Sequence, residues 1–337
     1  MRPATWPRSS PEAERLLVVD PLRDTRLGEL RSLLGPGDVL VLNDAATLPA
    51  ALRGVTARGE RLEARLTGLD GSRALAVVFG AGSWRTPTER RSPAPVLAPG
   101  DRLDFAALSA RVEQVESERL VRLRFAEEGA ALYRGLYSSG RPVQYSYLVG
   151  DLALWHVQSR FAARPWAVEM PSAGRPLSFG ILSGLARRGV RLATLTHAAG
   201  LSSTGSEALD GSLPLPERYE IPARTLALVR GAGRLIAVGT SVVRALEASF
   251  AEHGALRAGP GIARLRLDRS HVPRVVTGLL TGVHEPGTSH FELLEAFAPR
   301  ALLEQAFAHS ERAGYLAHEL GDSWLLLPPS RSDARAA

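Results

Sequence analysis

One segment of the chain combines hydroxyl groups, an arginine and the start of a helix. In GRLIAVGTSVVRALE, an apolar run ends at Gly239, Thr240 and Ser241 follow, and Arg244 lies one turn further on. The unbonded N–H groups of a helix N-terminus, together with hydroxyls and a guanidinium, suit a carboxylate or a phosphate. The alternative is an ordinary turn in which Thr240 and Ser241 cap the helix and Arg244 pairs with Glu247.

A second segment is a tight turn of small residues. EMPSAGRPLS contains Pro171, Ser172, Ala173 and Gly174 directly before a predicted helix. Small residues let a backbone approach a ligand closely, so this turn could line a binding site. It could equally be a plain loop.

Two histidines stand in turns where they could carry protons. His197 ends a predicted strand in LTHAAGLSSTG, and His284 follows an apolar run in HEPG. Imidazoles titrate near neutral pH, which suits acid–base chemistry, although a lone histidine can also be purely structural. Pro286 rules out a zinc-protease helix at His284, and the other histidines lack ligand spacing, so we expect no metal site.

The composition excludes several classes of chemistry. All 41 residues counted as Lys+Arg are arginines, and the chain has no cysteine. Lysine Schiff bases, Walker-type phosphate loops, zinc fingers, iron–sulfur clusters and thiol nucleophiles are therefore excluded. No G-x-G-x-x-G follows a strand and no G-x-S-x-G occurs, which disfavours dinucleotide oxidoreductases and serine hydrolases.

Charge and hydropathy bear on the partners and the location of the protein. The net charge of +6 permits an anionic partner without requiring one. No apolar run approaches the roughly 18 residues of a membrane span, and residues 1–10 lack the apolar region of a signal peptide. We therefore expect a cytoplasmic protein that does not contact a membrane.

Strand and helix patterns alternate at both ends of the chain. A leucine-rich helical pattern precedes an apolar run over 39–42, which leads into Asn43 and Asp44. From residue 152 on the alternation returns, with apolar strands over 191–195 and 235–238. This alternation of strands and helices predicts an α/β fold, in which strand ends present polar side chains such as Asn43 and Asp44.

The middle of the chain follows a different pattern. Apolar and charged residues alternate in segments such as RLEARL and LVRLRF, which predicts antiparallel strands. We expect a smaller antiparallel β-barrel-like domain over 61–151, inserted into a large α/β domain made of residues 1–60 and 152–337. The end of that domain, 328–337, is predicted to be a frayed tail.

Taken in order, the motifs of this chain resemble one known family. They are PGDVLVLNDAATLPA, the inserted β segment, EMPSAG, ATLTHAAG, ERYEIPA, RLIAVGTSVVRALE, LLTGVHEPGTS and YLAHELGDSWLL. Together they are similar to the S-adenosylmethionine:tRNA ribosyltransferase-isomerase family (QueA) of queuosine biosynthesis, over nearly the whole chain. The most specific pieces are VGTSVVRALE, PGDVLVLND and ERYEIPA.

The resemblance implies an unusual use of S-adenosylmethionine as a co-substrate. The family transfers the ribosyl part, and not the methyl group, to the aminomethyl group of a 7-deazaguanine at the tRNA wobble position. Adenine and methionine are released, and the ribose rearranges to the epoxycyclopentane of epoxyqueuosine. Such a reaction needs no lysine, cysteine or metal, which agrees with the composition.

The resemblance also implies roles for particular residues. Those in or facing the S-adenosylmethionine cradle would be Gly239, Thr240, Ser241, Arg244, Pro171, Ser172, Ala173, Gly174, Asn43 and Asp44. The candidate proton carriers are His197, Glu220 and His284, which the resemblance does not rank.

Three departures from the family pattern keep other functions open. The chain has Ala46 where the family has an arginine, Arg175-Pro176 where it has Leu-His, and Gly287 where it has a lysine. One alternative is a paralogue that uses S-adenosylmethionine with a non-tRNA acceptor. Another is a non-catalytic relative that binds RNA or protein.

Overall fold

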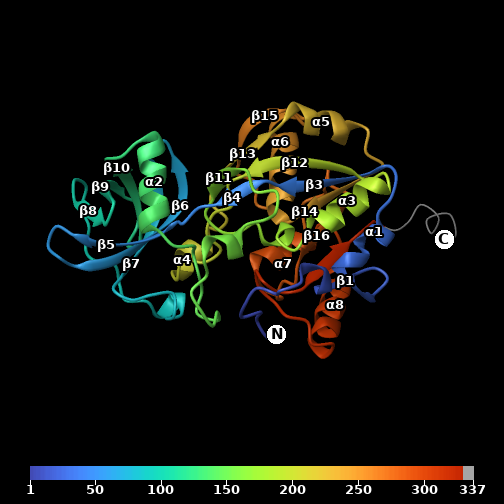
Figure 1. The fold of residues 1–337 in the computed structure, drawn as a ribbon, viewed down its shortest axis with the longest axis horizontal. Helices are drawn as coiled ribbons and strands as arrows, with labels where there is room; N and C mark the ends of the chain where they lie inside the picture. Colours follow the sequence, from blue (N-terminus) through green and yellow to red (C-terminus); the bar gives the residue numbers. More distant parts are fainter. Residues whose placement is uncertain (329–337) are drawn as a thin grey trace.

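The chain forms two bodies joined by a short ribbon (Figure 1). The structure is a computed structural model that describes residues 1–328, so the predicted tail lies outside the described residues from residue 329 on. The larger body is a mixed sheet covered by helices, and the smaller is a closed antiparallel barrel. The predicted fold class, a large α/β domain with an inserted antiparallel barrel, is confirmed.

The larger body is built on a nine-stranded sheet. Its strands, in spatial order, are β15 (Gly259–Ala263), β13 (Glu217–Ile221), β12 (Arg191–His197), β3 (Asp38–Asn43), β14 (Arg234–Val238), β16 (Gly278–Gly282), β17 (Ser323–Leu326), β1 (Arg15–Val18) and β2 (Arg23–Arg26). The central strands β12, β3, β14 and β16 run parallel, so their carboxyl ends meet at one edge. Of the parallel strands that follow β3 along the chain, β12 lies on one side of β3 and β14 on the other. Open α/β sheets bind ligands outside the carboxyl ends of their strands, at the point where the strand order reverses in this way.

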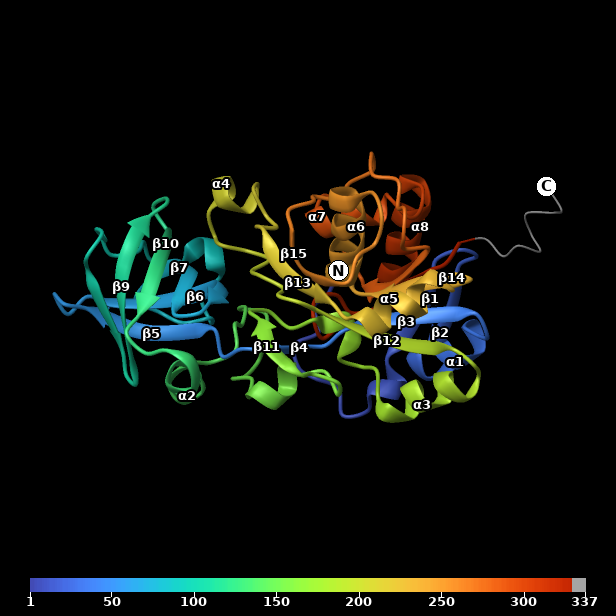
Figure 2. The same cartoon turned by 90° about the horizontal axis from the view of Figure 1, so that it is seen from above.

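Helices cover both faces of this sheet (Figure 2). One face carries α1 (Leu30–Leu33) and α3 (Phe179–Arg187), and the other carries α5 (Ala223–Arg230), α6 (Thr240–His253), α7 (Ser289–Leu294) and α8 (Arg300–Arg312). Alternate residues of β3 pack into the two cores, and all six are buried. Burial on both faces explains the continuous apolar run in the sequence. None of the helices in residues 1–328 has the length and hydropathy of a membrane span.

The smaller body is a barrel of six antiparallel strands. Its elements are β5 (Ala51–Thr56), β6 (Arg61–Asp70), β7 (Arg73–Gly80), β8 (Arg102–Phe105), β9 (Leu108–Val115), β10 (Leu120–Phe125) and the covering helix α2 (Gly129–Ser139). The barrel closes in the order β10-β7-β6-β5-β8-β9. Alternate apolar side chains such as Leu62, Ala64 and Leu66 fill its core, as the sequence pattern predicts.

The barrel begins earlier than predicted. Strand β5 belongs to it, whereas the predicted boundary at residue 61 left β5 in the α/β domain. Gly54 interrupts the apolar alternation of β5, because a Cβ there would lie 2.5 Å from the carbonyl oxygen of Asp104. At the other end, Arg141 pairs with Ala51, so the barrel closes ten residues before the predicted limit at 151.

A two-stranded parallel ribbon joins the bodies. Strand β4 (Ala45–Thr47) continues from β3 toward the barrel and pairs with β11 (Arg164–Ala167), which returns from it. Figure 1 shows this ribbon in the centre of the molecule. The remaining short elements are α4 (Glu207–Asp210) and the 3-10 turns η1 (Pro11–Ala13), η2 (Leu27–Glu29), η3 (Thr88–Arg90), η4 (Leu154–Val157) and η5 (Ser172–Gly174).

We propose that residues 48–142 form an independent domain. A closed barrel leaves no unpaired sheet edge, and among residues 1–328 only Val168 and Leu201 add buried side chains to its core from outside that range. The isolated fragment is expected to unfold in one cooperative step in urea, followed by far-UV circular dichroism. A gradual, non-sigmoidal loss of signal would show that the barrel depends on the larger body.

Two separate glycine-to-alanine substitutions in the fragment provide the control. Gly54→Ala should lower the urea midpoint strongly, because its Cβ would meet the backbone of Asp104 and the ring of Phe105. Gly68→Ala should leave the midpoint nearly unchanged, because nothing lies within 4 Å of its Cβ position.

Candidate functional site

Four of the predicted site residues lie at the carboxyl ends of the parallel strands. Asn43 ends β3, His197 ends β12, Gly239 follows β14 directly, and His284 follows β16 by two residues. Because these strands are neighbours in the sheet, the four positions lie at the same edge. This edge is the candidate site.

Asn43 ties three of these elements together. Its Oδ1 accepts hydrogen bonds from the backbone N–H of His197 (2.9 Å) and of Ala45 (3.0 Å). Its Nδ2 donates to the carbonyl oxygen of His197 (3.0 Å) and to Ser241 Oγ (3.3 Å). The amide of this buried side chain therefore holds the edge in shape.

Asp44 and Glu220 lie together beside this edge. Asp44 Oδ1 accepts a hydrogen bond from Thr196 Oγ1 at 2.6 Å, and Thr196 is paired with Glu220 across β12 and β13. Arg164 holds Glu220 through both guanidinium nitrogens, with Nη2 3.1 Å from Oε1. These hydrogen bonds lower the pKa of Glu220, so it stays ionised and is a weak base. Because side chains alternate along a strand, Glu220 and Thr196 face away from His197.

The start of α6 and the turn η5 form one surface. Gly239 has a φ of +89°, and a Cβ there would lie 3.4 Å from the Cβ of Ala173. Thr240 and Ser241 are the first helical residues, so their N–H groups have no acceptor within the helix. Contrary to the alternative considered from the sequence, neither hydroxyl caps the helix. The predicted turn Pro171, Ser172, Ala173 and Gly174 thus adjoins the predicted N-terminus of α6.

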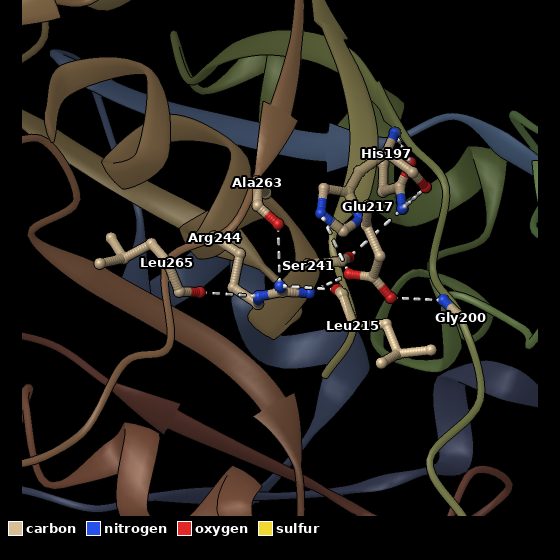
Figure 3. Close-up of polar contacts among 9 residues, drawn as sticks. His197, Gly200, Leu215, Glu217, Ser241, Arg244, Ala263 and Leu265 are labelled. Atoms are coloured by element: carbon tan, nitrogen blue, oxygen red, sulfur yellow. Dashed lines mark hydrogen bonds and ion pairs between the residues drawn. The ribbon is translucent and has the colours of Figure 1, made fainter. Parts of the chain in front are cut away.

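Arg244 points away from this surface into a buried network (Figure 3). The residue is 5% exposed, and its Nη1 donates to Glu217 Oε2. The other donors bind carbonyl oxygens of Leu215 (3.3 Å), Ala263 (3.2 Å) and Leu265 (3.3 Å). This geometry supports a positioning role in place of the contact with a ligand carboxylate inferred from the sequence. The pairing with Glu247 is also wrong, because Glu247 accepts the backbone N–H groups of residues 274–276.

His197 belongs to the same buried network. Its side chain is fully buried, its Nε2 lies 3.4 Å from Glu217 Oε2, and neither ring nitrogen has a hydrogen-bond partner within residues 1–328. Burial, with the nearby charge of Arg244, holds the pKa of His197 well below its usual value. Glu217 also accepts the N–H of Gly200 at 2.5 Å, and burial raises its pKa. The neutral His197 side chain is therefore packed beneath the edge and does not reach the surface of the candidate site.

His284 is partly exposed and is the best placed of the three candidate proton carriers. Its Nε2 lies 2.8 Å from Thr281 Oγ1, and its ring stacks on that of His290 at 5.0 Å between centroids. Burial and the neighbouring His290 and His318 hold the pKa of His284 well below its usual value. The imidazole is therefore neutral near pH 7 and can accept a proton.

Four polar residues of the region escaped the sequence analysis. Tyr145, Tyr147, Glu169 and Glu319 line one pocket, and each tyrosine hydroxyl donates to one of the carboxylates. Glu169 opens the EMPSAG motif, which could have drawn attention to it. The two tyrosines lie outside every motif quoted above, so only the fold reveals them.

The structure gives a local reason for two of the departures from the family pattern. Arg175 Nε donates to the carbonyl oxygen of His156 at 2.7 Å, so this side chain fixes the segment before β11. Gly287 has a φ of +85°, which glycine adopts at little cost, in the turn before α7. Within residues 1–328, no group of three or more His, Asp or Glu side chains is arranged to hold a metal.

Arg244→Ala should destabilise the protein strongly. It would leave Glu217 buried without its cation and three carbonyls without their donor, and breaking a buried ion pair costs about 3–5 kcal/mol. Urea denaturation measures the loss, and Glu217→Gln should reduce the additional cost of Arg244→Ala. Normal stability combined with weaker S-adenosylmethionine binding in calorimetry would instead place Arg244 against the ligand.

Comparison with known proteins agrees with this architecture. The family described as "Queuosine biosynthesis protein" matches residues 2–326. An S-adenosylmethionine:tRNA ribosyltransferase-isomerase from Gloeobacter violaceus is 35% identical over 96% of this chain and 92% of its own. One from Methylorubrum extorquens is 31% identical over 96% and 93%. The crystal structure of S-adenosylmethionine tRNA ribosyltransferase from Thermotoga maritima superposes with a TM-score of 0.51, at 21% identity and 96% coverage of both chains. The chain therefore belongs to the queuosine biosynthesis protein family.

Proposed function

We propose that this chain is an S-adenosylmethionine:tRNA ribosyltransferase-isomerase. It transfers and isomerises the ribosyl moiety of S-adenosylmethionine onto the aminomethyl group of 7-aminomethyl-7-deazaguanine in tRNA, giving epoxyqueuosine and releasing adenine and methionine. The observation that carries the proposal is the identity of 35% with a relative of that name over 96% of the chain.

The strand-end site has the groups that this co-substrate requires. The free N–H groups of Thr240 and Ser241 favour the methionine carboxylate, and the helix dipole of α6 adds to that attraction. The turn from Pro171 to Gly174 packs against Gly239, so backbone atoms line this end of the site. Asn43 keeps the three elements in register through four hydrogen bonds.

His284 is the proposed proton acceptor. The sulfonium of S-adenosylmethionine acidifies the hydrogens on the adjacent ribose carbon, so a neutral base at that position could start the loss of adenine. His284 is neutral, half-buried and at the strand edge, whereas His197 is fully buried and Glu220 is bound to Arg164. Thr281 Oγ1, 2.8 Å from Nε2, fixes the orientation of the ring.

The first test is one incubation. Purified protein is mixed with S-adenosylmethionine, with and without tRNA bearing the aminomethyl base, and the products are analysed by mass spectrometry. We expect adenine, methionine and added ribosyl mass on the tRNA only when that tRNA is present. Adenine release without tRNA would instead favour a different acceptor, and tight binding without turnover a non-catalytic relative.

The second test concerns His284. His284→Ala should lower kcat by about 100-fold or more and leave S-adenosylmethionine affinity nearly unchanged, as expected for loss of a general base. Because only the neutral imidazole accepts a proton, kcat of the wild type should fall as the pH drops through the lowered pKa of His284. His253→Ala, at the far end of α6, is the matched control. An unchanged kcat in His284→Ala would remove His284 from the chemistry.

A further inference from the structure

A small pocket opens beside the strand-end site. Tyr145, Tyr147, Glu169 and Glu319 supply its polar groups, and Met170 is among its apolar lining residues. The pocket is assembled from four separate parts of the chain: strand β4, the segment after the barrel, the segment before η5, and the C-terminal segment before β17.

The two carboxylates of this pocket are fixed by the tyrosines. Tyr145 donates to Glu169 Oε1, which also accepts the N–H of Ser202 at 3.1 Å, and Tyr147 donates to Glu319 Oε2. Neither carboxylate forms an ion pair within residues 1–328, whereas Asp38, Glu217 and Asp322 of the larger body each pair with an arginine. The pocket therefore contains two carboxyl groups that have no ion-pair partner among residues 1–328.

The positive charge that acts on Glu169 belongs to an arginine that is already paired with another carboxylate. Arg65 of the barrel acts electrostatically on Glu169, but its Nε is bound to Glu63 Oε1 at 2.9 Å. Burial raises the pKa of both Glu169 and Glu319, as expected for carboxylates without a close counter-ion. A cation bound in the pocket would stabilise their ionised forms.

Aromatic rings complete the surroundings. Tyr145 and Tyr147 stack at 6.3 Å between centroids, and Tyr147 stacks on His318 at 4.5 Å. Aromatic rings and carboxylates together attract cations that have no hydrogen atoms to donate, as known for quaternary ammonium groups. An onium group of this kind is the ligand chemistry that these side chains would attract.

The pocket also adjoins the proposed co-substrate site. Met170 lines it and directly precedes Pro171, while the N–H of Val168, next to Glu169, is bound to the carbonyl oxygen of Ala199 just after β12. The pocket and the start of α6 are thus connected through the same segment, 168–174. A ligand with a carboxylate at one end and an onium centre nearby could contact both.

We propose that Glu169 and Glu319 form the subsite for the sulfonium of S-adenosylmethionine. The inference rests on the proposed function. The acceptor ammonium fits less well, because two carboxylates would keep that amine protonated and so suppress its attack, whereas the charge of a sulfonium is permanent. The subsite therefore recognises the charged centre of the co-substrate.

The test compares two nucleosides that differ in this charge. S-adenosylmethionine carries the sulfonium, and S-adenosylhomocysteine has a neutral thioether in its place. Dissociation constants of both are measured by calorimetry for the wild type, Glu169→Gln and Glu319→Gln. Glutamine keeps the size of the side chain and can still accept the tyrosine hydrogen bond. Glu252→Gln, an exposed position at the far end of α6, is the matched control.

We expect the wild type to prefer S-adenosylmethionine, and each pocket variant to reduce that preference by about tenfold. The affinity for S-adenosylhomocysteine should stay the same, and Glu252→Gln should change neither constant. An unchanged preference in both pocket variants, or an equal loss for both nucleosides, would overturn the subsite. If the wild type bound neither nucleoside, the proposed function itself would fail and the inference with it.

Discussion

The structure depends on one requirement, which is that β3 must be buried on both faces and still end in a polar residue at the sheet edge. A buried amide is tolerated only when its donors and acceptor are bonded. Asn43 meets this condition with four hydrogen bonds to the end of β12, the start of β4 and the start of α6. Satisfying this one side chain therefore fixes the relative positions of the elements that form the site.

The buried ion pair between Arg244 and Glu217 also fixes the elements that form the site. Taking Arg244 and Glu217 out of water is costly, and their mutual attraction alone offsets that cost only partly. The guanidinium also binds three carbonyl oxygens in and around β13 and β15, and Glu217 binds the loop after His197. The pair thus joins α6 to the edge strands, and the orientation of the helix N-terminus follows from this junction.

The sequence predicts the helices and strands better than it predicts which side chains pair with one another. Periodicity identified β3, β12 and β14 within a few residues, because each is apolar on the faces that it buries. It missed β5, where Gly54 replaces an apolar residue for steric reasons that involve a strand far along the chain. It offered Arg244 either a ligand carboxylate or Glu247 as its partner, whereas the actual partner, Glu217, lies on β13 and is brought close by the fold.

The family resemblance directed attention to the candidate site but not to all of the residues around it. It directed attention to strand ends, which motifs mark, and overlooked Tyr145 and Tyr147, which lie in the connection between the two bodies. That connection has little periodicity, so its side chains can be assigned only when the barrel is placed against the sheet.

The barrel has a structural role in this placement. The guanidinium of Arg65, on β6, lies 5.6 Å from the centroid of the Tyr145 ring, and the hydroxyl of Tyr145 is bound to Glu169 of the larger body. Tyr145 is thus held between a cation of one body and an anion of the other. A change in the angle between the bodies would move this ring and alter the pocket beside the strand ends. Inserting the barrel between β3 and β12 therefore couples the geometry of the pocket to the packing of the two bodies.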